Sequence, residues 1–290
     1  MFFLLAFVSA FAYSLQSSLL VKQARSMERL SLTFYRMLAL SVILSPMLLG
    51  VAAHDYQQLV PLFPLLTISG LCGASYVWSQ FYVVQFIPVG VATSFNLSLR
   101  TLAAFILGWL FLAESLIPMQ GLLIVIILLG GVVVASGKNH MPHLNNDTRR
   151  GVCVSLISGL LGAISFFTLS IASKQANPFM VGYFWELSIF IGTGGILLLR
   201  RVFTGQGLQN ISLQAFKNIA KFSSPTLIGT ICAAFALKMG SLALFSAIAS
   251  LSVVFASIFS KILYNEKLKL IQWLGIVISL AGVVALKLYS

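Results

Sequence analysis

Charged residues are scarce in this 290-residue chain, and acidic residues are the scarcest. Only 8% of the residues are charged, with 6 Asp and Glu against 18 Lys and Arg, while 59% are hydrophobic. A soluble domain of this size needs far more polar surface to cover its core. The deficit excludes an ordinary soluble protein and predicts that the chain lies in lipid, where helices or a closed barrel are the only options.

Cysteine clusters, metal-binding motifs and enzyme signatures are also missing. Cys72, Cys153 and Cys232 form no CxxC pair, so we interpret them as small hydrophobic residues. His140 and His143 have no neighbouring ligand residues, which argues against a metal site. The chain has no HExxH or GxSxG motif, and its one glycine-rich stretch before a lysine is spaced wrongly for a P-loop. We therefore expect no enzyme activity, no metal and no cofactor.

Ten apolar runs are long enough to cross a bilayer as helices. Each is close to the ~20 residues that span about 30 Å of hydrocarbon, and none resembles the alternating strands of a barrel. We place the spans at 2–21, 31–50, 62–84, 89–112, 116–136, 151–173, 178–199, 223–239, 242–262 and 270–288. The first run lacks a basic n-region and a cleavage site, so we interpret it as a span. These runs predict an all-α polytopic membrane protein.

One of the longer connections, at about 200–222, has the pattern of an amphipathic helix. Four apolar residues fall near one helical face, and Lys217 and Lys221 fall elsewhere. The apolar positions are Ile211, Ala215, Ile219 and Phe222. This spacing predicts a short helix in the membrane interface, and a plain surface loop is the alternative.

The chain contains an internal repeat with an offset of 152 residues. The matches include Lys22-Gln23-Ala24 with Lys174-Gln175-Ala176, Glu114 with Glu266, Gln120 with Gln272, and Gly130 with Gly282. A two-residue gap then aligns Phe34-Tyr35-Arg36 with Phe184-Trp185-Glu186. We expect two five-helix repeats at 1–136 and 151–290, joined by a polar linker at 137–150. Because five is odd, the second repeat should be inverted in the membrane, as in many secondary transporters.

The net charge of +12 reports membrane topology and not a nucleic-acid partner, because the basic residues lie in short clusters between apolar runs. If successive connections alternate sides, one side carries Lys22, Arg25, Arg29, Lys138, Arg149, Arg150, Arg200, Arg201, Lys217, Lys221, Lys261, Lys267 and Lys269. The other side has only Lys174, Lys238 and Lys287. The positive-inside rule then places both termini outside the cytoplasm.

The carboxy-terminal part of each repeat carries a pattern of small residues, an apolar span, Glu-x-Leu, Gln and a Gly-rich span. Ala113-Glu114-Ser115-Leu116 and Asn265-Glu266-Lys267-Leu268 fill its Glu position twice. Together with Lys22 and Phe34-Tyr35-Arg36, this pattern resembles EamA-type members of the drug/metabolite transporter superfamily. The family often has Gly where this chain has Ala113 and Asn265. The resemblance implies a multi-pass transporter with cytoplasmic termini; on sidedness we follow the charges of this chain.

Ionisable residues inside spans are costly, at about 2.5–3.5 kcal/mol on insertion scales, and therefore indicate function. Arg100 lies near the middle of the fourth span, on a small, polar face shared by Ala92, Asn96, Ala104 and Gly108. We expect Arg100 and Asn96 to bind an anionic group such as a carboxylate. The alternative is a structural arginine bound to helix-end carbonyls or to Glu186.

Aromatic and amide residues should line a cavity beside Arg100, suited to amphipathic metabolites or aromatic amino acids. The candidates are Tyr13, Gln16, Tyr76, Trp78, Gln80, Tyr82, Tyr183 and Trp185, of which Tyr13, Tyr76 and Gln80 are assigned to the binding site. Packing or an interfacial aromatic belt is the alternative. Ser252, Ala256 and Ser260, spaced by four, are expected to form a close-packing seam.

Arg36 and Glu186 occupy equivalent positions in the two repeats. They could form an inter-repeat salt bridge or a gate that breaks during transport, or Arg36 could extend to the lipid interface. Glu186 is the carboxylate well inside a span and is thus the candidate for proton coupling. Glu114 and Glu266 precede the last span of each repeat, where we expect them to cap exposed backbone N–H groups.

These features predict a secondary transporter or exporter of small organic solutes, such as amino acids or carboxylates, that works by alternating access in the cell (plasma or inner) membrane. The lipid bilayer and a small-molecule solute are its expected partners, and the sequence leaves a homodimer open. The alternative is a non-transport membrane protein, either a scaffold or sensor subunit or a lipid-handling enzyme.

Overall fold

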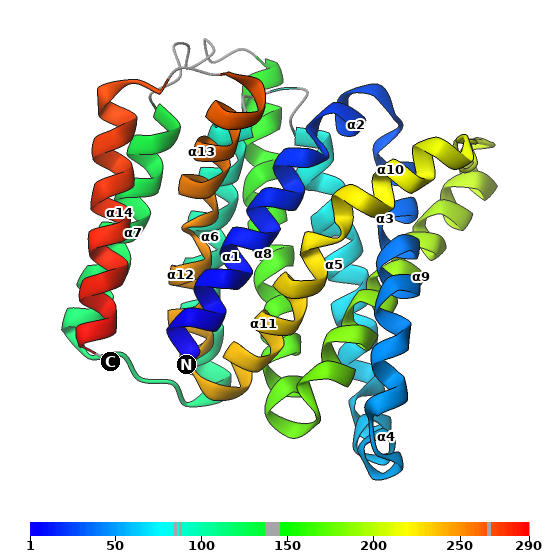
Figure 1. The fold of residues 1–290 in the computed structure, drawn as a ribbon, viewed down its shortest axis with the longest axis horizontal. Coiled ribbons are helices and arrows are strands. Elements are labelled where there is room, and N and C mark those ends of the chain that lie inside the picture. The colour runs from blue at the N-terminus through cyan, green and yellow to red at the C-terminus, as the bar shows by residue number, and fades with distance from the viewer. Residues whose placement is uncertain (84–85, 87–88, 137–145, 266–267, 290) are drawn as a thin grey trace.

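The computed structural model describes residues 1–83, 86, 89–136, 146–265 and 268–289 (Figure 1). The described residues form helices and no strands. The helices are α1 (Phe2–Leu19), α2 (Val21–Ser26), α3 (Arg29–Leu44), η1 (Ser45–Gly50), α4 (Ala53–Leu59), η2 (Val60–Leu62), α5 (Phe63–Val83), α6 (Val89–Leu112), α7 (Pro118–Ser136), α8 (Asn146–Gln175), α9 (Pro178–Thr204), α10 (Leu213–Ser223), α11 (Pro225–Met239), α12 (Leu242–Ala249), α13 (Ser252–Tyr264) and α14 (Leu270–Leu288).

The predicted membrane spans are present. Nine helical stretches of the described chain are long and apolar enough to cross a membrane, and Pro118–Val134 of α7 is a shorter tenth. The prediction of an all-α polytopic protein with ten transmembrane helices is thus confirmed. The ninth span is not one helix, because α12 ends at Ala249 and α13 begins at Ser252.

Several helix boundaries follow from local capping. Glu28 accepts hydrogen bonds from the backbone N–H groups of the first turn of α3, and Asn177 and Ser241 do the same for α9 and α12. Pro178 occupies the first position of α9, where its missing N–H has no helical partner to lose. α9 ends at Gly205, which has a positive φ of 70° that glycine adopts without strain.

The two repeats are inverted and interleaved. In Figure 1, α1 begins at the side where both chain ends lie, here called the termini side, and its counterpart α8 begins at the opposite side, here called the α2 side. Contacts between the repeats come in symmetric pairs, because α5 packs on α8 as α11 packs on α1, and α6 packs on α8 as α13 packs on α1. α3 packs on its own counterpart α9, and α7 on α14. A pseudo-two-fold axis therefore relates the halves.

Equivalent residues of the two repeats make matching hydrogen bonds where α7 packs against α14. The side-chain amide of Gln120 accepts a hydrogen bond from the backbone N–H of Ile117 and donates one to Tyr289 O. Gln272, 152 residues later, does the same with the N–H of Lys269 and with Val134 O. These hydrogen bonds join the ends of the two repeats.

The connection between the repeats is described only in part. Residues 137–145 of the predicted linker, which include His140 and His143, lie outside the described residues, and residues 146–150 form the first turns of α8. The predicted amphipathic segment is helical, as α10, with Ile219 buried and Lys217 and Lys221 exposed. α10 packs against α3.

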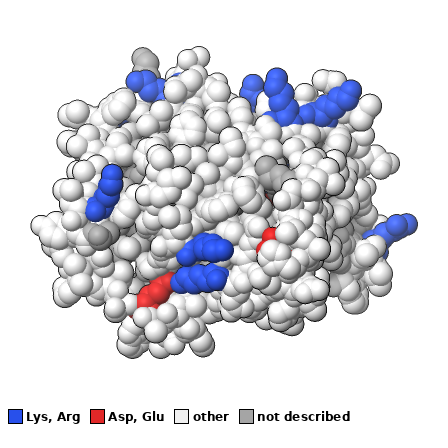
Figure 2. Space-filling model, turned by 60° about the horizontal axis from the view of Figure 1, so that its bottom comes forward, with Lys and Arg blue, Asp and Glu red and all other residues white. Residues whose placement is uncertain are grey.

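The outer surface is suited to lipid. Figure 2 shows a surface that is mostly uncharged, with the Lys and Arg side chains in a few small groups. Large hydrophobic side chains such as Trp109, Phe111 and Ile191 are exposed on it. A soluble protein rarely exposes so many, so this surface supports a multi-pass membrane protein.

Candidate functional site

A cavity of about 580 Å³ lies between the two halves of the bundle. Its lining residues come from α1, α2, α3, α5, α6, α8, α9, α12 and α13. The lining includes Arg25 of α2, Val83 at the end of α5 and Tyr264 at the end of α13, all of which belong to the α2 side in Figure 1. The cavity therefore reaches from the middle of the bundle to the α2 side.

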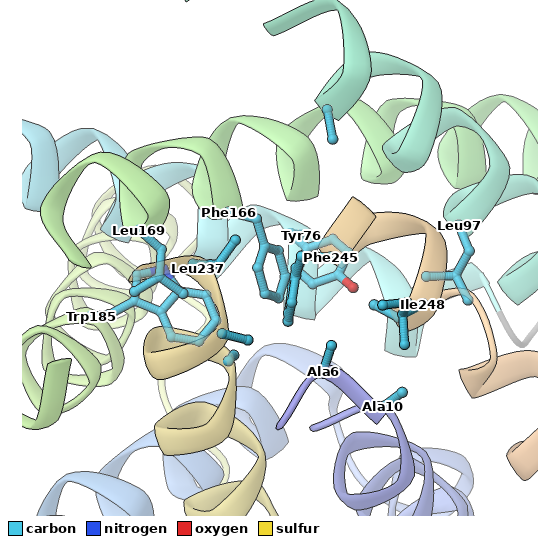
Figure 3. Packing of buried hydrophobic residues seen from close by; sticks show 14 of the residues in the cluster. Ala6, Ala10, Tyr76, Leu97, Phe166, Leu169, Trp185, Leu237, Phe245 and Ile248 are labelled. Carbon is cyan, nitrogen blue, oxygen red and sulfur yellow. The ribbon is translucent and has the colours of Figure 1, made fainter. Parts of the chain in front are cut away.

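An aromatic floor closes the cavity toward the termini side. Phe166 of α8 lies between Trp185 of α9 and Phe245 of α12, with ring centroids 5.3 Å and 5.7 Å away (Figure 3). Leu169 and Leu237 are fully buried in the same hydrophobic cluster (Figure 3). The cavity thus reaches the α2 side, and packed side chains separate it from the termini side.

Arg100 lies at this floor. Its side chain is buried, at 5% exposure, and lines the cavity. One guanidinium nitrogen, Nη1, donates a hydrogen bond to the Tyr76 hydroxyl at 3.0 Å, and the guanidinium carbon lies 4.9 Å from the centroid of the Phe166 ring. Its Nε is buried and has no hydrogen-bond partner among the described residues. Tyr76 and Phe166 orient the cation, and no ion pair among the described residues involves Arg100.

Asn96 lies one helical turn before Arg100 and also lines the cavity. Its amide nitrogen donates a hydrogen bond to Ser158 Oγ at 2.7 Å, which attaches α6 to α8. Its Oδ1 atom is buried and has no hydrogen-bond partner among the described residues. Asn96 and Arg100 thus line the same cavity from one helix, and their role in binding a solute stays a prediction.

Glu186 of α9 belongs to a buried polar chain that connects α9, α11 and α1. Thr230 of α11 donates a hydrogen bond to Glu186 Oε1, and the Tyr13 hydroxyl of α1 lies 2.9 Å from the same threonine oxygen. The second carboxylate oxygen, Oε2, is buried and has no hydrogen-bond partner among the described residues. Both Tyr13 and Glu186 line the cavity.

Arg36 lines the same cavity from α3. It is only 5% exposed, so the alternative in which it extends to the lipid interface is wrong. None of the ion pairs among the described residues joins Arg36 to Glu186, so the predicted direct salt bridge is absent from this conformation. The two charges nevertheless share one cavity, so they can act on the same ligand.

The predicted aromatic and amide residues separate into two groups. Gln16, Gln80 and Trp185 line the cavity together with Tyr13 and Tyr76, whereas Trp78, Tyr82 and Tyr183 do not belong to its lining. Trp78 and Tyr82 stack on each other with centroids 5.2 Å apart. Every residue that the sequence assigned to substrate binding or gating thus lies at the cavity, and the aromatic residues outside it pack elsewhere.

The interpretation of Ser252, Ala256 and Ser260 as a simple packing seam needs correction, because all three line the cavity. Ser252 also packs against α1, where its backbone oxygen accepts a hydrogen bond from Ser14 at 3.0 Å and its hydroxyl donates one to Ala10 O at 3.2 Å. These bonds lie at the break between α12 and α13. Side-chain donors compensate for the helical hydrogen bonds lost at such a break inside a membrane protein.

Glu114 caps a helix, but not the one that was predicted. Its Oε1 accepts from the backbone N–H of Leu242 at 2.9 Å and its Oε2 from that of Ala243 at 3.3 Å, so it caps α12 of the other repeat and not α7. Lys174 of α8 lies 3.2 Å from Oε1. The sequence could not show this, because the capped helix is 128 residues away along the chain. Glu266 lies outside the described residues.

Sequence reasoning missed several residues of the site, four of which hold or close it. Thr230 and Ser158 hold Glu186 and Asn96, and Phe166 and Phe245 form the floor. Threonine, serine and phenylalanine are common in membrane helices, so no local signal marked these positions. The repeat could have drawn attention to α8, whose counterpart α1 supplies Tyr13.

Comparison with known proteins agrees with the fold. The model of the EamA-like transporter family matches residues 1–136 and 149–288. One solved chain, titled only "Crystal structure of protein", has a TM-score of 0.77 and 13% identity over 99% of this chain and 96% of its own, a likeness that supports the fold alone. No curated protein sequence matches. Because the family model covers nearly the whole chain, this protein belongs to the EamA-like transporter family.

Proposed function

We propose that the protein is a secondary transporter or exporter of small organic solutes that carry a carboxylate, such as amino acids, and that it works by alternating access in the cell membrane. The observation that carries this proposal is Arg100, a buried cation with no described acidic partner, which lines the cavity. A buried, unpaired cation is unfavourable unless a counter-charge binds there. A carboxylate can accept charge-assisted hydrogen bonds from such a guanidinium.

The shape and lining of the cavity support a small amphipathic solute. A volume of about 580 Å³ lies within the range of about 300–1,000 Å³ typical of small-molecule sites. The aromatic floor offers apolar contact to the body of the solute. Arg100 can donate hydrogen bonds to its carboxylate, and Asn96 Oδ1, which no described residue donates to, can accept one from a donor group such as an amine. A phosphorylated solute would need a denser cationic cluster than Arg36 and Arg100.

Energy for transport would come from a solute or ion gradient. Glu186 is buried, and its Oε2 has no hydrogen-bond partner within the described part of the chain, which suits a group that takes up a proton or another cation during the cycle. The Thr230 hydroxyl holds the other oxygen, so changes at Glu186 can be passed to α11. If the positive-inside rule applies, the open α2 side faces the cytoplasm, which suits loading of an exported solute.

The experiment that tests the proposal is counterflow exchange in proteoliposomes with pools of labelled amino acids and other carboxylates. We expect saturable exchange by the natural protein and a loss of at least tenfold in Arg100→Ala. Arg201→Ala is the matched control, because Arg201 is exposed at the end of α9 and should leave exchange unchanged.

Exchange that survives in a folded Arg100→Ala protein would remove Arg100 from the binding site. Absence of exchange for every pool, with correctly folded protein, would contradict the proposal and favour a lipid-handling or scaffold role instead. Partial activity of Arg100→Lys would show that charge is needed and that the planar guanidinium adds to it.

A further inference from the structure

At the termini side, a single carboxylate joins the two repeats. Glu114 follows α6 of the first repeat, and its partners, the N-terminus of α12 and Lys174 of α8, belong to the second. The side chain of Glu114 has 9% relative exposure in this contact. The cavity is closed on this side, so the contact helps to hold the closed conformation.

The repeat indicates which residues would line an opening on this side. At the α2 side the open mouth is lined by Ser18, Val21, Ala24 and Arg25. Adding the repeat offset of 152 gives their counterparts at the end of α8 and just after it, on the termini side. These counterparts are Ser170, Ser173, Ala176 and Asn177.

Two of these counterparts are serines whose burial is unusual, an observation that does not depend on the repeat. Ser170 and Ser173 are both 0% exposed, and neither hydroxyl has a hydrogen-bond partner among the described residues. A buried hydroxyl without a hydrogen bond is unfavourable. Hydration of both hydroxyls in a second conformation would explain why serines occupy these positions.

The other two counterparts already lie at a pocket. Ala176 and Asn177 line a separate pocket of about 260 Å³ with Asp55, Gln58 and Lys238. Asn177 also donates a hydrogen bond to Asp55 of α4, which belongs to the first repeat, at 3.2 Å. This pocket corresponds by symmetry to the outer mouth of the open cavity.

The C-terminal half of α6 supplies two further counterparts of residues that line the open cavity. Ala256 and Ser260 line the open cavity, and their counterparts under the repeat are Ala104 and Gly108. A Cβ atom at Gly108 would lie 2.5 Å from Glu114 Oε2, so the carboxylate of Glu114 occupies the space beside this glycine. Glu114 therefore both blocks the space that a solute would pass on this side and connects the two repeats.

We propose that the termini side contains a second entrance to the central cavity, lined by Ser170, Ser173, Ala176 and Asn177 of the α8 end and by Ala104 and Gly108 of α6, and closed by Glu114. This inference rests on the proposed alternating-access function. In the second conformation Glu114 leaves Lys174 and α12, and water and the carboxylate solute reach Arg100 from the termini side.

The test is the reactivity of single cysteines toward a charged methanethiosulfonate reagent, in lipid nanodiscs that leave both faces accessible. Cys72, Cys153 and Cys232 are first replaced by alanine. Ser173→Cys reports the second entrance, and Ala172→Cys is its matched control, because Ala172 is the adjacent residue and is equally buried at 0% exposure. Ser17→Cys, an exposed position of the α2-side mouth, reports the side that is already open.

We expect Ser173→Cys to react at least tenfold faster than Ala172→Cys. Adding Glu114→Gln should raise the rate at Ser173→Cys several-fold and lower the rate at Ser17→Cys, because the population moves toward the second conformation. A rate at Ser173→Cys no faster than at Ala172→Cys, with and without Glu114→Gln, would overturn the inference.

Failure of this inference and failure of the proposed function can be distinguished. The labelling needs no solute, whereas counterflow exchange needs no cysteine. Exchange without labelling at Ser173→Cys would leave a transporter with a different second pathway. Labelling at Ser173→Cys without exchange for any solute would support the second entrance and contradict the proposed substrate class.

Discussion

Arg36 and Glu186 occupy equivalent positions in the two repeats and line one cavity, yet none of the ion pairs among the described residues joins them. Glu186 instead accepts a hydrogen bond from Thr230, and its other oxygen is buried without a described partner. Had the two charges neutralised each other directly, neither would be available to a ligand. Their separation leaves a cation and an anion, on α3 and α9, facing a shared space.

We expect Glu186→Gln to uncouple transport from the proton gradient while keeping solute exchange. The amide has nearly the same shape and can still accept the hydrogen bond from Thr230, but it cannot take up or release a proton. Accumulation driven by a pH gradient should fall at least tenfold, and counterflow exchange without a gradient should change less than threefold. Both are measured in the same proteoliposomes.

The matched control is Asp147→Asn, which removes an exposed acid in the first turn of α8, outside the cavity lining. It should leave both counterflow exchange and gradient-driven accumulation unchanged. Gradient-driven accumulation that persists in Glu186→Gln would remove this residue from coupling.

Removal of the Tyr76 hydroxyl should weaken solute binding. Tyr76→Phe loses the hydrogen bond that holds Arg100 Nη1 at 3.0 Å, so the guanidinium becomes less well oriented. Hydrogen bonds to charged groups contribute about 1.5–3 kcal/mol, which corresponds to a half-saturation concentration raised by about tenfold or more. The maximal exchange rate should change by a smaller factor than the half-saturation concentration. Tyr183→Phe, outside the cavity lining, is the control, and an equal effect there would contradict a specific role for Tyr76.

The fold could be predicted from the sequence because the bilayer imposes length and composition on every span. The last predicted span, 270–288, coincides with α14, and the fourth, 89–112, with α6. The offset of 152 residues predicted the inversion, which the matching hydrogen bonds of Gln120 and Gln272 display. Hydropathy could not show the break between Ala249 and Ser252, because both sides of it are equally apolar.

The site could be predicted where ionisable, amide or aromatic side chains in the spans marked it. Arg36, Arg100 and Glu186 stand out because ionisable residues are rare in spans, and all three line the cavity. Contacts between distant residues stayed hidden, such as Thr230 with Glu186 and Glu114 with the start of α12. Such pairings depend on tertiary packing, which a single sequence does not state.

Gly130 and Gly131 provide a matched test of the α7–α14 contact. A Cβ at Gly130 would lie 2.4 Å from Ser279 Oγ and 2.9 Å from Gly275 O, whereas a Cβ at Gly131 meets nothing within 4 Å. We expect Gly130→Ala to destabilise the protein by about 1–3 kcal/mol through overpacking. Gly131→Ala should be neutral or stabilising, because alanine favours the helix. Thermal unfolding in detergent measures both, and equal melting temperatures would contradict this packing.

Ala113 and Asn265, which are 152 residues apart, share a φ of 52°. This left-handed conformation costs roughly 1–2 kcal/mol for a residue with a Cβ and less for asparagine. Ala113→Gly should therefore raise the melting temperature by a few degrees, and Asn265→Gly by less. Ala163→Gly, in the buried interior of α8, is the control and should lower it. A lower melting temperature in Ala113→Gly would contradict the strain.

Glu28 should make stability depend on pH. Burial alone would raise the pKa of its carboxyl group, but hydrogen bonds from Ser31 and Leu30 and the charge of Arg200 together lower the pKa below its usual value. Arg200 Nη1 lies 2.9 Å from Glu28 Oε1, which attaches the start of α3 to the end of α9. Because the folded-state pKa is the lower one, the carboxylate stabilises the fold above the unfolded-state pKa, and this stabilisation is lost as the pH falls through the folded-state pKa.

Glu28→Gln should therefore lower the melting temperature at pH 7, through a loss of about 0.5–1 kcal/mol. The difference from the natural protein should stay constant above the unfolded-state pKa of about 4.3 and narrow as the pH falls through the lower folded-state pKa, where the natural carboxyl group is protonated as well. Asp147→Asn, an exposed acid in the first turn of α8, is the control for the loss of one negative charge. A difference that does not narrow even at about pH 2, below the usual range of carboxyl pKa values, would show that Glu28 acts through its shape and not through its charge.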